Sequence, residues 1–345
     1  MRFGIFDHME FRGDSLGQLY EERLKMLEYA DDAGFWCYHK AEHHFIHLDA
    51  APSSNVFLAA ASQRTSRIRF GPLVYLLPFY EPIRLIEEIC ALDHLSGGRL
   101  EVGVGKGISP AEHMLWGRSP DEARSRFEEV FAIVREGLVN DVLSFDGDFY
   151  RIRDATLPMR PLQQPHPAFW YPGNFDYAGR HRLNTIVGGP AERIADQLEQ
   201  YLGLAADCEE NFNPGVAQPT FGATRHFYVA ASDEAALARV GAAYPVYHRN
   251  LAKLFKQYDV PFPTVDPSFG GDMDAAIAHE GLVAGSPETV ARHVAAVRDA
   301  GIDYLVGAFA WGDLSHDETM TSIDLFAREV MPQFGPLTAP ENQRR

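Results

Sequence analysis

The sequence predicts an α/β protein that folds as a single (β/α)8 barrel, and three observations carry this prediction. The chain has 345 residues, which is long for one ordinary domain but normal for a barrel with insertions. Short apolar runs alternate with amphipathic stretches, and no change of composition marks a second domain. Such alternation requires a parallel sheet covered by helices, and eight units favour closure over the alternative, an open doubly wound sheet.

The expected strands are short runs rich in β-branched and aromatic residues. They are Arg2–Phe6, Trp36–Lys40, Ile68–Leu77, Leu100–Gly105, Ala168–Tyr171, Leu183–Val187, Phe221–Ala230 and Asp303–Ala310. The third run is almost continuously apolar, as expected for a strand that is buried on both faces.

The expected helices show apolar residues at helical spacing, and several have clear ends. They are Gly17–Ala33, Ser53–Gln63, Pro82–Leu95, Pro120–Leu138, Glu192–Leu204, Asp233–Tyr247, Pro287–Ala300 and His316–Val330. Pro82 is a typical first helical residue, and Gly34 and Gly97 are typical stop signals.

We therefore expect one barrel domain over residues 1–335, with insertions at about 140–166 and 256–280. Asp146-Gly147 lies between short apolar runs and predicts a small hairpin in the first insertion. Asp259–His279 is rich in Pro, Gly, Asp and Phe, and its length makes it a candidate lid. Residues 336–345 are expected to be a disordered tail.

Charge and the chain's beginning limit the classes of partner. The formal net charge of −17 argues against nucleic acids and anionic membranes, which attract clustered Lys and Arg. The chain begins directly with a strand, and no apolar run of 18 residues occurs, so we expect a cytoplasmic protein. Three cysteines without paired spacing fit neither a disulfide framework nor a zinc site.

In such barrels the functional site forms where the strands end at their carboxyl side. The residues at these ends are Asp7, His8, Glu42, His43, His44, Leu73, Val74, Tyr75, Gly105, Lys106, Gly107, Gly173, Asn174, Trp311 and Gly312. Most informative are Glu42, His43 and His44, because two histidines beside a carboxylate are costly to bury without a task. A histidine can transfer protons or stabilise a polar intermediate. The alternatives are a backbone contact in a loop, or a metal site, which would need more ligands than these.

Two glycine-containing segments are candidates for contacts to a ligand. Gly103–Gly107 does not have the spacing of a dinucleotide-binding loop, but it suits backbone that approaches a flat ligand, with Lys106 near a phosphate. The alternative for Lys106 is a solvated charge. Gly173-Asn174 precedes a possible short helix and offers N–H donors to a phosphate, or it is a plain turn.

Ala41–Phe45 resembles the Glu-His-His-Phe segment of the bacterial luciferase-like monooxygenases. The resemblance continues through Phe70–Pro78, Arg84–Gly107, Gly285–Glu288 and Leu325–Pro332. It covers roughly residues 1–189 and 281–334, whereas the middle of the chain is only loosely similar. Several motifs in the same order make the resemblance specific for the family, though not for a substrate.

The resemblance implies a TIM barrel that binds FMN, reduced by a separate reductase, and activates O2 as a C4a-peroxyflavin. By matching position, His43 is the catalytic histidine beside the flavin, flanked by Glu42 and His44. Leu73-Val74 matches a non-proline cis peptide that contacts the isoalloxazine ring, and Tyr75 follows it.

Two positions implied to contact the flavin phosphate depart from the family pattern. Lys106, after Gly105, stands where relatives often have arginine, which is a bidentate donor rather than a point charge. Gly173-Asn174 stands where luciferase has an acidic residue followed by serine.

The expected substrate is a small apolar molecule, because aromatic residues gather near the predicted site. The candidates for its pocket are His8, Phe45, Phe79, Trp116, Trp311, Tyr75 and Phe309, and the alternative for each aromatic residue is a place in the core. Phe3–His8 and Arg160–Pro165 resemble limonene-type monooxygenases. Three other functions stay open: deazaflavin-dependent hydride transfer, metal-dependent hydrolysis, and flavin binding without catalysis.

The family usually forms dimers through helices that follow early strands. The apolar positions in Ser53–Gln63 and Pro82–Leu95 are compatible with a homodimer.

Overall fold

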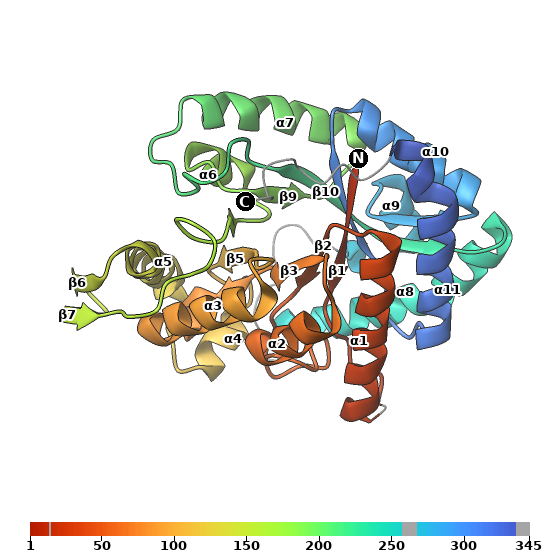
Figure 1. Ribbon diagram of the computed structural model, residues 1–345. Coiled ribbons are helices and arrows are strands. Elements are labelled where there is room, and N and C mark those ends of the chain that lie inside the picture. The colour runs from red at the N-terminus through yellow and green to blue at the C-terminus, as the bar shows by residue number, and fades with distance from the viewer. Residues whose placement is uncertain (14, 257–267, 336–345) are drawn as a thin grey trace.

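A curled parallel sheet with helices on its outside forms the centre of the computed structural model (Figure 1), which describes residues 1–13, 15–256 and 268–335. Eight strands coincide with the predicted runs. They are β1 (Arg2–Asp7), β2 (Cys37–Lys40), β3 (Arg69–Pro72), β5 (Val102–Gly105), β8 (Phe169–Trp170), β9 (Thr185–Val187), β10 (Phe221–Val229) and β12 (Tyr304–Ala308).

The strands pair in parallel, so their carboxyl ends lie on one side of the sheet. One sheet has the order β11-β10-β12-β1-β2-β3, in which β11 is Leu282–Gly285, and β9 pairs with the first residues of β10. A second sheet has the order β4-β5-β8, in which β4 is Tyr75–Leu76. Isolated bridges join the two sheets, one between Phe70 and Leu100 and one between Trp170 and Asn184.

Long helices cover the convex side of the sheet, and most begin and end close to the predicted residues. They are α1 (Leu16–Ala33), α2 (Ser54–Arg64), α3 (Pro82–Ser96), α5 (Ala123–Val139), α7 (Ala191–Ala206), α8 (Asp233–Lys256), α10 (Pro287–Asp299) and α11 (His316–Leu325). Gly34 and Gly97 end α1 and α3 in the left-handed conformation, with φ of 87° and 66°. The short helix α6 (Phe175–Arg180) follows Gly173-Asn174, where a possible short helix was predicted, whereas α4 (Pro110–Leu115) and α9 (Met273–Ala278) were not predicted as separate elements.

Three elements differ from the prediction. The run Ile68–Leu77 is not one strand, because it divides into β3 and β4 (Tyr75–Leu76) at the Leu73-Val74 peptide. That peptide is cis, as the resemblance implies. The short strand β11 (Leu282–Gly285) was missed, and α8 extends nine residues beyond Tyr247 because Leu251, Leu254 and Phe255 are buried.

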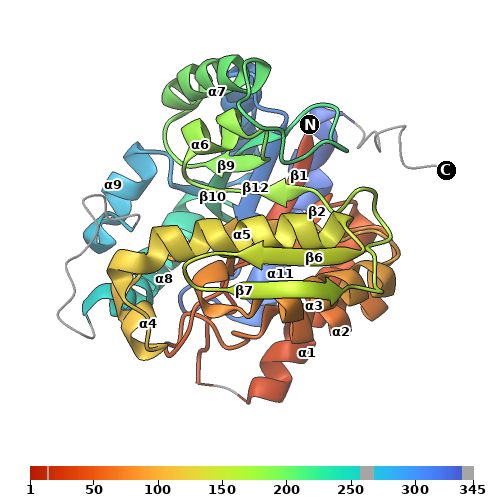
Figure 2. The same cartoon turned by 90° about the vertical axis from the view of Figure 1, so that its left-hand side faces the viewer.

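The predicted hairpin is confirmed as the antiparallel pair β6 (Val142–Asp146) and β7 (Arg151–Thr156). Figure 2 shows it outside α5, and the Glu129 carboxylate on α5 accepts hydrogen bonds from the backbone N–H groups of Asp148, Phe149 and Tyr150. Of the candidate lid, residues 259–267 lie outside the described residues, as does the tail 336–345. The remainder forms a short turn and α9.

Side chains alternate between the two faces of the sheet, as successive strand residues must. Phe3, Ile5 and Tyr38 belong to the large core cluster between the sheet and the outer helices. A separate buried cluster lies on the concave face and contains Cys37, Leu73, Trp170, Ile186, Tyr304 and Val306, with Val74 packed against it. The cis peptide therefore lies against the concave face of the sheet.

We expect Gly71→Ala to destabilise the protein by about 1–3 kcal/mol, because the added methyl group overpacks the contact between β3 and β5. A Cβ at Gly71 would lie 1.9 Å from the backbone oxygen of Glu101. Gly203→Ala is the matched control, since nothing lies within 4 Å of its Cβ position and Ala favours the helix. Urea unfolding of both variants measures the effect, and equal stability of the two would contradict it.

Candidate active site

Three histidines from different strands meet at the carboxyl edge of the sheet. His8 follows β1, His43 follows β2, and His226 lies on β10. The rings of His8 and His43 stack with centroids 5.8 Å apart and planes at 22°. Tyr247 of α8 contacts both His8 and His226, with ring centroids 6.2 and 4.5 Å away. Sequence analysis missed His226 because it lies within a strand rather than after one.

Burial keeps two of these histidines neutral. It lowers the pKa of His8 well below its usual value, and the nearby His43, His226 and Lys40 lower it further. Burial also lowers the pKa of His226 to about 4. Both rings therefore offer neutral imidazoles at neutral pH, and neither adds a positive charge beside His43.

A buried ion pair holds the backbone of the His43 loop. The N–H of His43 donates to Asp49 Oδ2 at 3.0 Å, and Lys40 Nζ donates to the same oxygen at 2.8 Å. Asp49 Oδ1 accepts from the N–H of Ala51 at 2.8 Å. The side chains of Lys40 and Asp49 are both 0% exposed. Asp49 was not predicted, because its role depends on the loop folding back on β2.

Glu112 is the acidic residue that faces His43, and sequence analysis missed it as well. Its Oε1 lies 3.5 Å from His43 Nδ1 and accepts from the N–H of His44 at 2.7 Å. Glu112 Oε2 and His43 Nδ1 are buried, and neither has a hydrogen-bond partner within the described part of the chain. The signal available was Ser109-Pro110-Ala111-Glu112, the pattern of a helix start, and Ser109 does accept from the N–H of Glu112.

Glu42, which was predicted to be catalytic, contacts neighbours other than His43. Its oxygens accept from the Tyr80 hydroxyl at 2.6 Å, from the N–H of Leu76 at 3.4 Å, and face His44 Nε2 at 3.2 Å. Glu42 therefore ties the loop after β2 to the segment after β3. The His44 side chain likewise faces Glu42 rather than His43.

Four of the predicted residues form one aromatic cluster beside the three histidines of the site: His44, Phe45, Phe79 and Trp116. The Trp116 ring stacks on Phe79 with centroids 5.8 Å apart, and its centroid lies 5.2 Å from His44 and 6.0 Å from Phe45. His113, which was not predicted, joins through Phe79 at 4.8 Å. Phe45 and Trp116 are exposed, so this cluster presents apolar surface at the carboxyl edge.

Two other predicted pocket residues lie in the core instead. Trp311 is buried against Tyr244 and Tyr247, and its Nε1–H donates to the backbone oxygen of Phe227. It still reaches the site through an edge contact with His226. Phe309 packs between Phe227 and Phe326 and contributes no pocket surface.

The residues that were predicted to contact the flavin lie on two different faces of the sheet. Leu73 and Val74 belong to the concave cluster. Tyr75 is buried in the outer core, and its hydroxyl donates to Asn55 of α2, so its side chain does not face the concave side. A Cβ at Gly105 would lie 2.5 Å from Val74 Cγ2, so packing against the neighbouring segment already favours glycine at this position.

The predicted phosphate contacts lie at the exposed rim. Lys106 is exposed, and its backbone oxygen accepts from His113 Nε2 at 2.9 Å. Gly173 has a φ of 81°, and the Asn174 side chain accepts from the N–H of Tyr177 as the cap of α6. The Gly173 N–H donates to the Ile186 oxygen at 3.1 Å, which places this turn beside the end of β9.

Glu10 is a buried carboxyl group directly behind the site. It accepts from Asn250 Nδ2 at 3.0 Å and from the N–H of Gly312 at 2.5 Å. Burial raises the pKa of Glu10 to about 7 despite these contacts. The folded protein therefore keeps a proton on Glu10 that the unfolded chain releases near pH 4.5.

Because the folded-state pKa is the higher one, we expect Glu10 to lower the free energy of unfolding as pH rises from about 4.5 to 7. The expected loss is of the order of 2–3 kcal/mol. Glu10→Gln should flatten this part of the stability curve. Urea unfolding between pH 4.5 and 8 measures the slope, and parallel curves for both proteins would refute the assignment.

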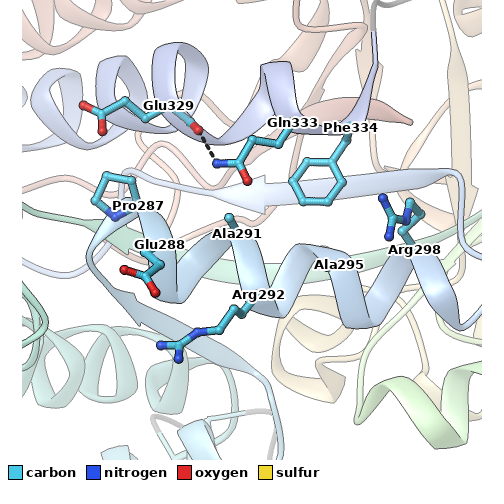
Figure 3. A pocket seen from close by; sticks show the side chains of 9 residues that line it. All are labelled: Pro287, Glu288, Ala291, Arg292, Ala295, Arg298, Glu329, Gln333 and Phe334. Atoms are coloured by element: carbon cyan, nitrogen blue, oxygen red, sulfur yellow. Dashed lines mark hydrogen bonds between the residues drawn. The ribbon is translucent and has the colours of Figure 1, made fainter.

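A hollow lies on the outside of the helical layer, away from the histidines of the site. Figure 3 shows its lining residues on α10 and on the helical turns after α11. Its volume is about 470 Å³. Two glutamates and two arginines line it, so it has no net ionic preference. Within the described ranges, no group of three or more His, Cys, Asp or Glu is placed to hold a metal ion. No helix in the same ranges is long and apolar enough to cross a membrane.

The fold is that of an α/β protein with a curled parallel sheet, which carries a histidine loop and a non-proline cis peptide at its carboxyl edge. A family model described as luciferase-like monooxygenase matches residues 1–304, and the chain belongs to this family.

Several relatives of the chain are named monooxygenases, and one of them is named flavin-dependent. The uncharacterized protein y4wF of Sinorhizobium fredii is 35% identical and covers 97% of this chain and 98% of its own. The oxygenase component of the flavin-dependent trigonelline monooxygenase of Acinetobacter baylyi is 29% identical over 68% of this chain and 66% of its own. Limonene 1,2-monooxygenase of Rhodococcus erythropolis is 27% identical over 99% of this chain and 89% of its own.

Solved structures support the same fold. The monooxygenase RslO1 from Streptomyces bottropensis has a TM-score of 0.84 at 27% identity and covers 97% of this chain and 100% of its own. The oxygenating constituent of 3,6-diketocamphane monooxygenase from Pseudomonas putida was solved with FMN. It has a TM-score of 0.74 at 21% identity and covers 96% of this chain and 98% of its own. The predicted family is therefore confirmed, and the chain is a flavin-dependent monooxygenase.

Proposed function

We propose that the chain is the oxygenase component of a two-component monooxygenase, which uses reduced FMN from a separate reductase to oxygenate a small organic substrate. The observation that carries this proposal is His43, which lies between the neutral His8 ring and the Glu112 carboxylate at the carboxyl edge of the sheet. The FMN in the diketocamphane enzyme and the name of the trigonelline relative, an oxygenase component, support it.

The described residues fit a flat ligand that has apolar faces and a polar edge. Leu73 and Val74 offer an apolar wall. The buried nitrogen His226 Nε2 has no hydrogen-bond partner among the described residues, which is uncommon for a buried polar atom and suits a ligand or bound water. We propose that Leu73 and Val74 hold the ring system, and that Lys106 and Gly173-Asn174 face the phosphate.

When bound, reduced FMN supplies the electrons and the carbon atom at which O2 reacts. The protein's part is to place a proton and exclude water. A proton on His43 Nδ1 faces Glu112 Oε1, which leaves Nε2 as the ring nitrogen available to the reacting oxygen. The exposed aromatic cluster of Phe45, Phe79 and Trp116 provides apolar surface for a substrate next to this nitrogen.

We further infer that the parallel pairings and the two bridges close the eight predicted strands into a (β/α)8 barrel within one domain of residues 1–335. We also propose a homodimer through α2 and α3, on which Val56 and Leu95 are 71% and 55% exposed. Sedimentation that shows only a 38.6 kDa species at micromolar concentration would exclude the dimer.

Anaerobic titration with chemically reduced FMN, followed by exposure to air, tests the proposed function. We expect tight binding of reduced FMN, slower release of hydrogen peroxide than from free reduced FMN, and transfer of ¹⁸O from ¹⁸O2 to a terpene or cyclic ketone substrate. Binding of a reduced deazaflavin in preference to FMN, without reaction with O2, would instead indicate hydride transfer. Binding of FMN without oxygen transfer to any substrate would indicate a non-catalytic relative.

A further inference from the structure

We propose that the groove between the His43 loop and α8 is the entrance subsite for a substrate that carries a carboxylate on an apolar body. This inference rests on the proposed function, because it names the substrate class of the same site. The groove, called here the cationic groove, has a volume of about 630 Å³. This volume is typical of small-molecule sites. Its lining consists of Phe45, Ile46, His47, His248, Arg249, Ala252 and Lys253.

The charge of the cationic groove is opposite to that of the chain as a whole. The formal net charge is −17, yet none of the lining residues is acidic and two are cationic. Arg249 and Lys253 are one helical turn apart on α8, so their side chains lie on the same face. The groove therefore concentrates positive charge in a protein whose surface is mostly negative.

Arg249 and Lys253 have no carboxylate partner in the described part of the chain. Exposed arginines elsewhere pair with acidic residues, as Arg84 does with Glu88 and Arg180 with Asp176. Lys253 Nζ has only His47 Nδ1 at 3.4 Å, and Arg249 makes no hydrogen bond to a described residue. Both can therefore bind an anion without breaking an existing ion pair.

The cationic groove also has an apolar wall. Phe45 is 54% exposed and has a φ of 64°. A positive φ is uncommon for a bulky residue, and such strain often occurs at ligand contacts. The Phe45 ring continues into the aromatic cluster, 6.0 Å from Trp116. His43 precedes Phe45 by two residues, so the groove is lined by the same loop that carries the catalytic histidine.

Charge and apolar surface together select the class of ligand. Inorganic phosphate gains nothing from Phe45 and Ile46, and a neutral terpene gains nothing from Arg249 and Lys253. A molecule that combines one carboxylate with an aromatic or alicyclic body uses both, with the carboxylate at α8 and the apolar body toward Phe45 and Trp116.

Equilibrium binding of 2-naphthoate and of the uncharged 2-naphthamide to the purified full chain, without flavin, tests the proposal. We expect naphthoate to bind about tenfold more tightly, and Arg249→Gln/Lys253→Gln to remove this advantage. Lys25→Gln/Arg153→Gln is the matched control, because it changes the net charge equally at exposed positions far from the groove. Phe45→Ala should weaken the binding of both probes.

Four results would overturn the proposal. Equal binding of the two probes would do so, as would an advantage that survives in Arg249→Gln/Lys253→Gln. Displacement of naphthoate by inorganic phosphate of similar affinity would assign the groove to charge alone. Tighter binding of a hexaglutamate peptide than of naphthoate would assign it to an acidic protein segment.

Failure of this inference is distinguishable from failure of the proposed function, because the probes are tested without flavin. A chain that binds reduced FMN and transfers oxygen but shows no preference for naphthoate keeps its function and loses only the carboxylate subsite. A chain that prefers naphthoate but does not bind reduced FMN loses the function on which the inference rests.

Discussion

Replacing His43 with Ala is expected to lower kcat for substrate oxygenation by about 10²–10⁴-fold, the usual contribution of a positioned proton donor or acceptor. The ring lies between His8 and Glu112, and no other described side chain in the loop occupies that position. Reduced FMN should still bind, because Leu73 and Val74 are unchanged, and the reaction with O2 should release hydrogen peroxide instead of product. Product formation and peroxide release, measured together, check this.

His94→Ala is the control, since His94 is an exposed residue near the end of α3. It should leave both rates unchanged. Glu112→Gln should lower kcat less than His43→Ala and shift its pH profile, because Glu112 acts through His43. Full oxygenation by His43→Ala with normal FMN binding would show that the assigned role is wrong.

Lys40→Met is expected to lower the free energy of unfolding by about 3–5 kcal/mol, because it leaves the Asp49 carboxylate buried without its partner charge. Asp49 retains only the backbone N–H groups of His43 and Ala51. The loss should appear as a lower urea midpoint with an unchanged slope.

Arg84→Met is the matched control, since the Arg84–Glu88 pair lies on the surface with side chains 73% and 33% exposed. Its expected effect is at most about 1 kcal/mol. Combining Lys40→Met with Asp49→Asn should recover part of the lost stability, since the unpaired charge is then removed. If Lys40→Met cost no more than Arg84→Met, the buried pair would have no structural importance.

Much of the fold could be predicted from local patterns. Strand runs, helix periods and stop signals depend on residues close in sequence, so Gly34, Gly97 and Pro82 marked helix ends that the structure confirms. The end of α8 and strand β11 were misjudged because they depend on burial against distant residues. In barrels of this kind the functional site forms at the carboxyl ends of the parallel strands. That rule was enough to select His8 and His43 as candidates.

The sequence by itself determined which segments become strands and helices, and which strand ends carry histidines. Only the tertiary structure decided where side chains point: Tyr75 to the outer core, Trp311 into the core, and Glu42 to Tyr80 rather than His43. Only it brought Glu112 to His43 across 69 residues of chain. The physical reason is that periodicity is a local property, whereas a side chain's partners depend on strand register and on packing between elements far apart in sequence.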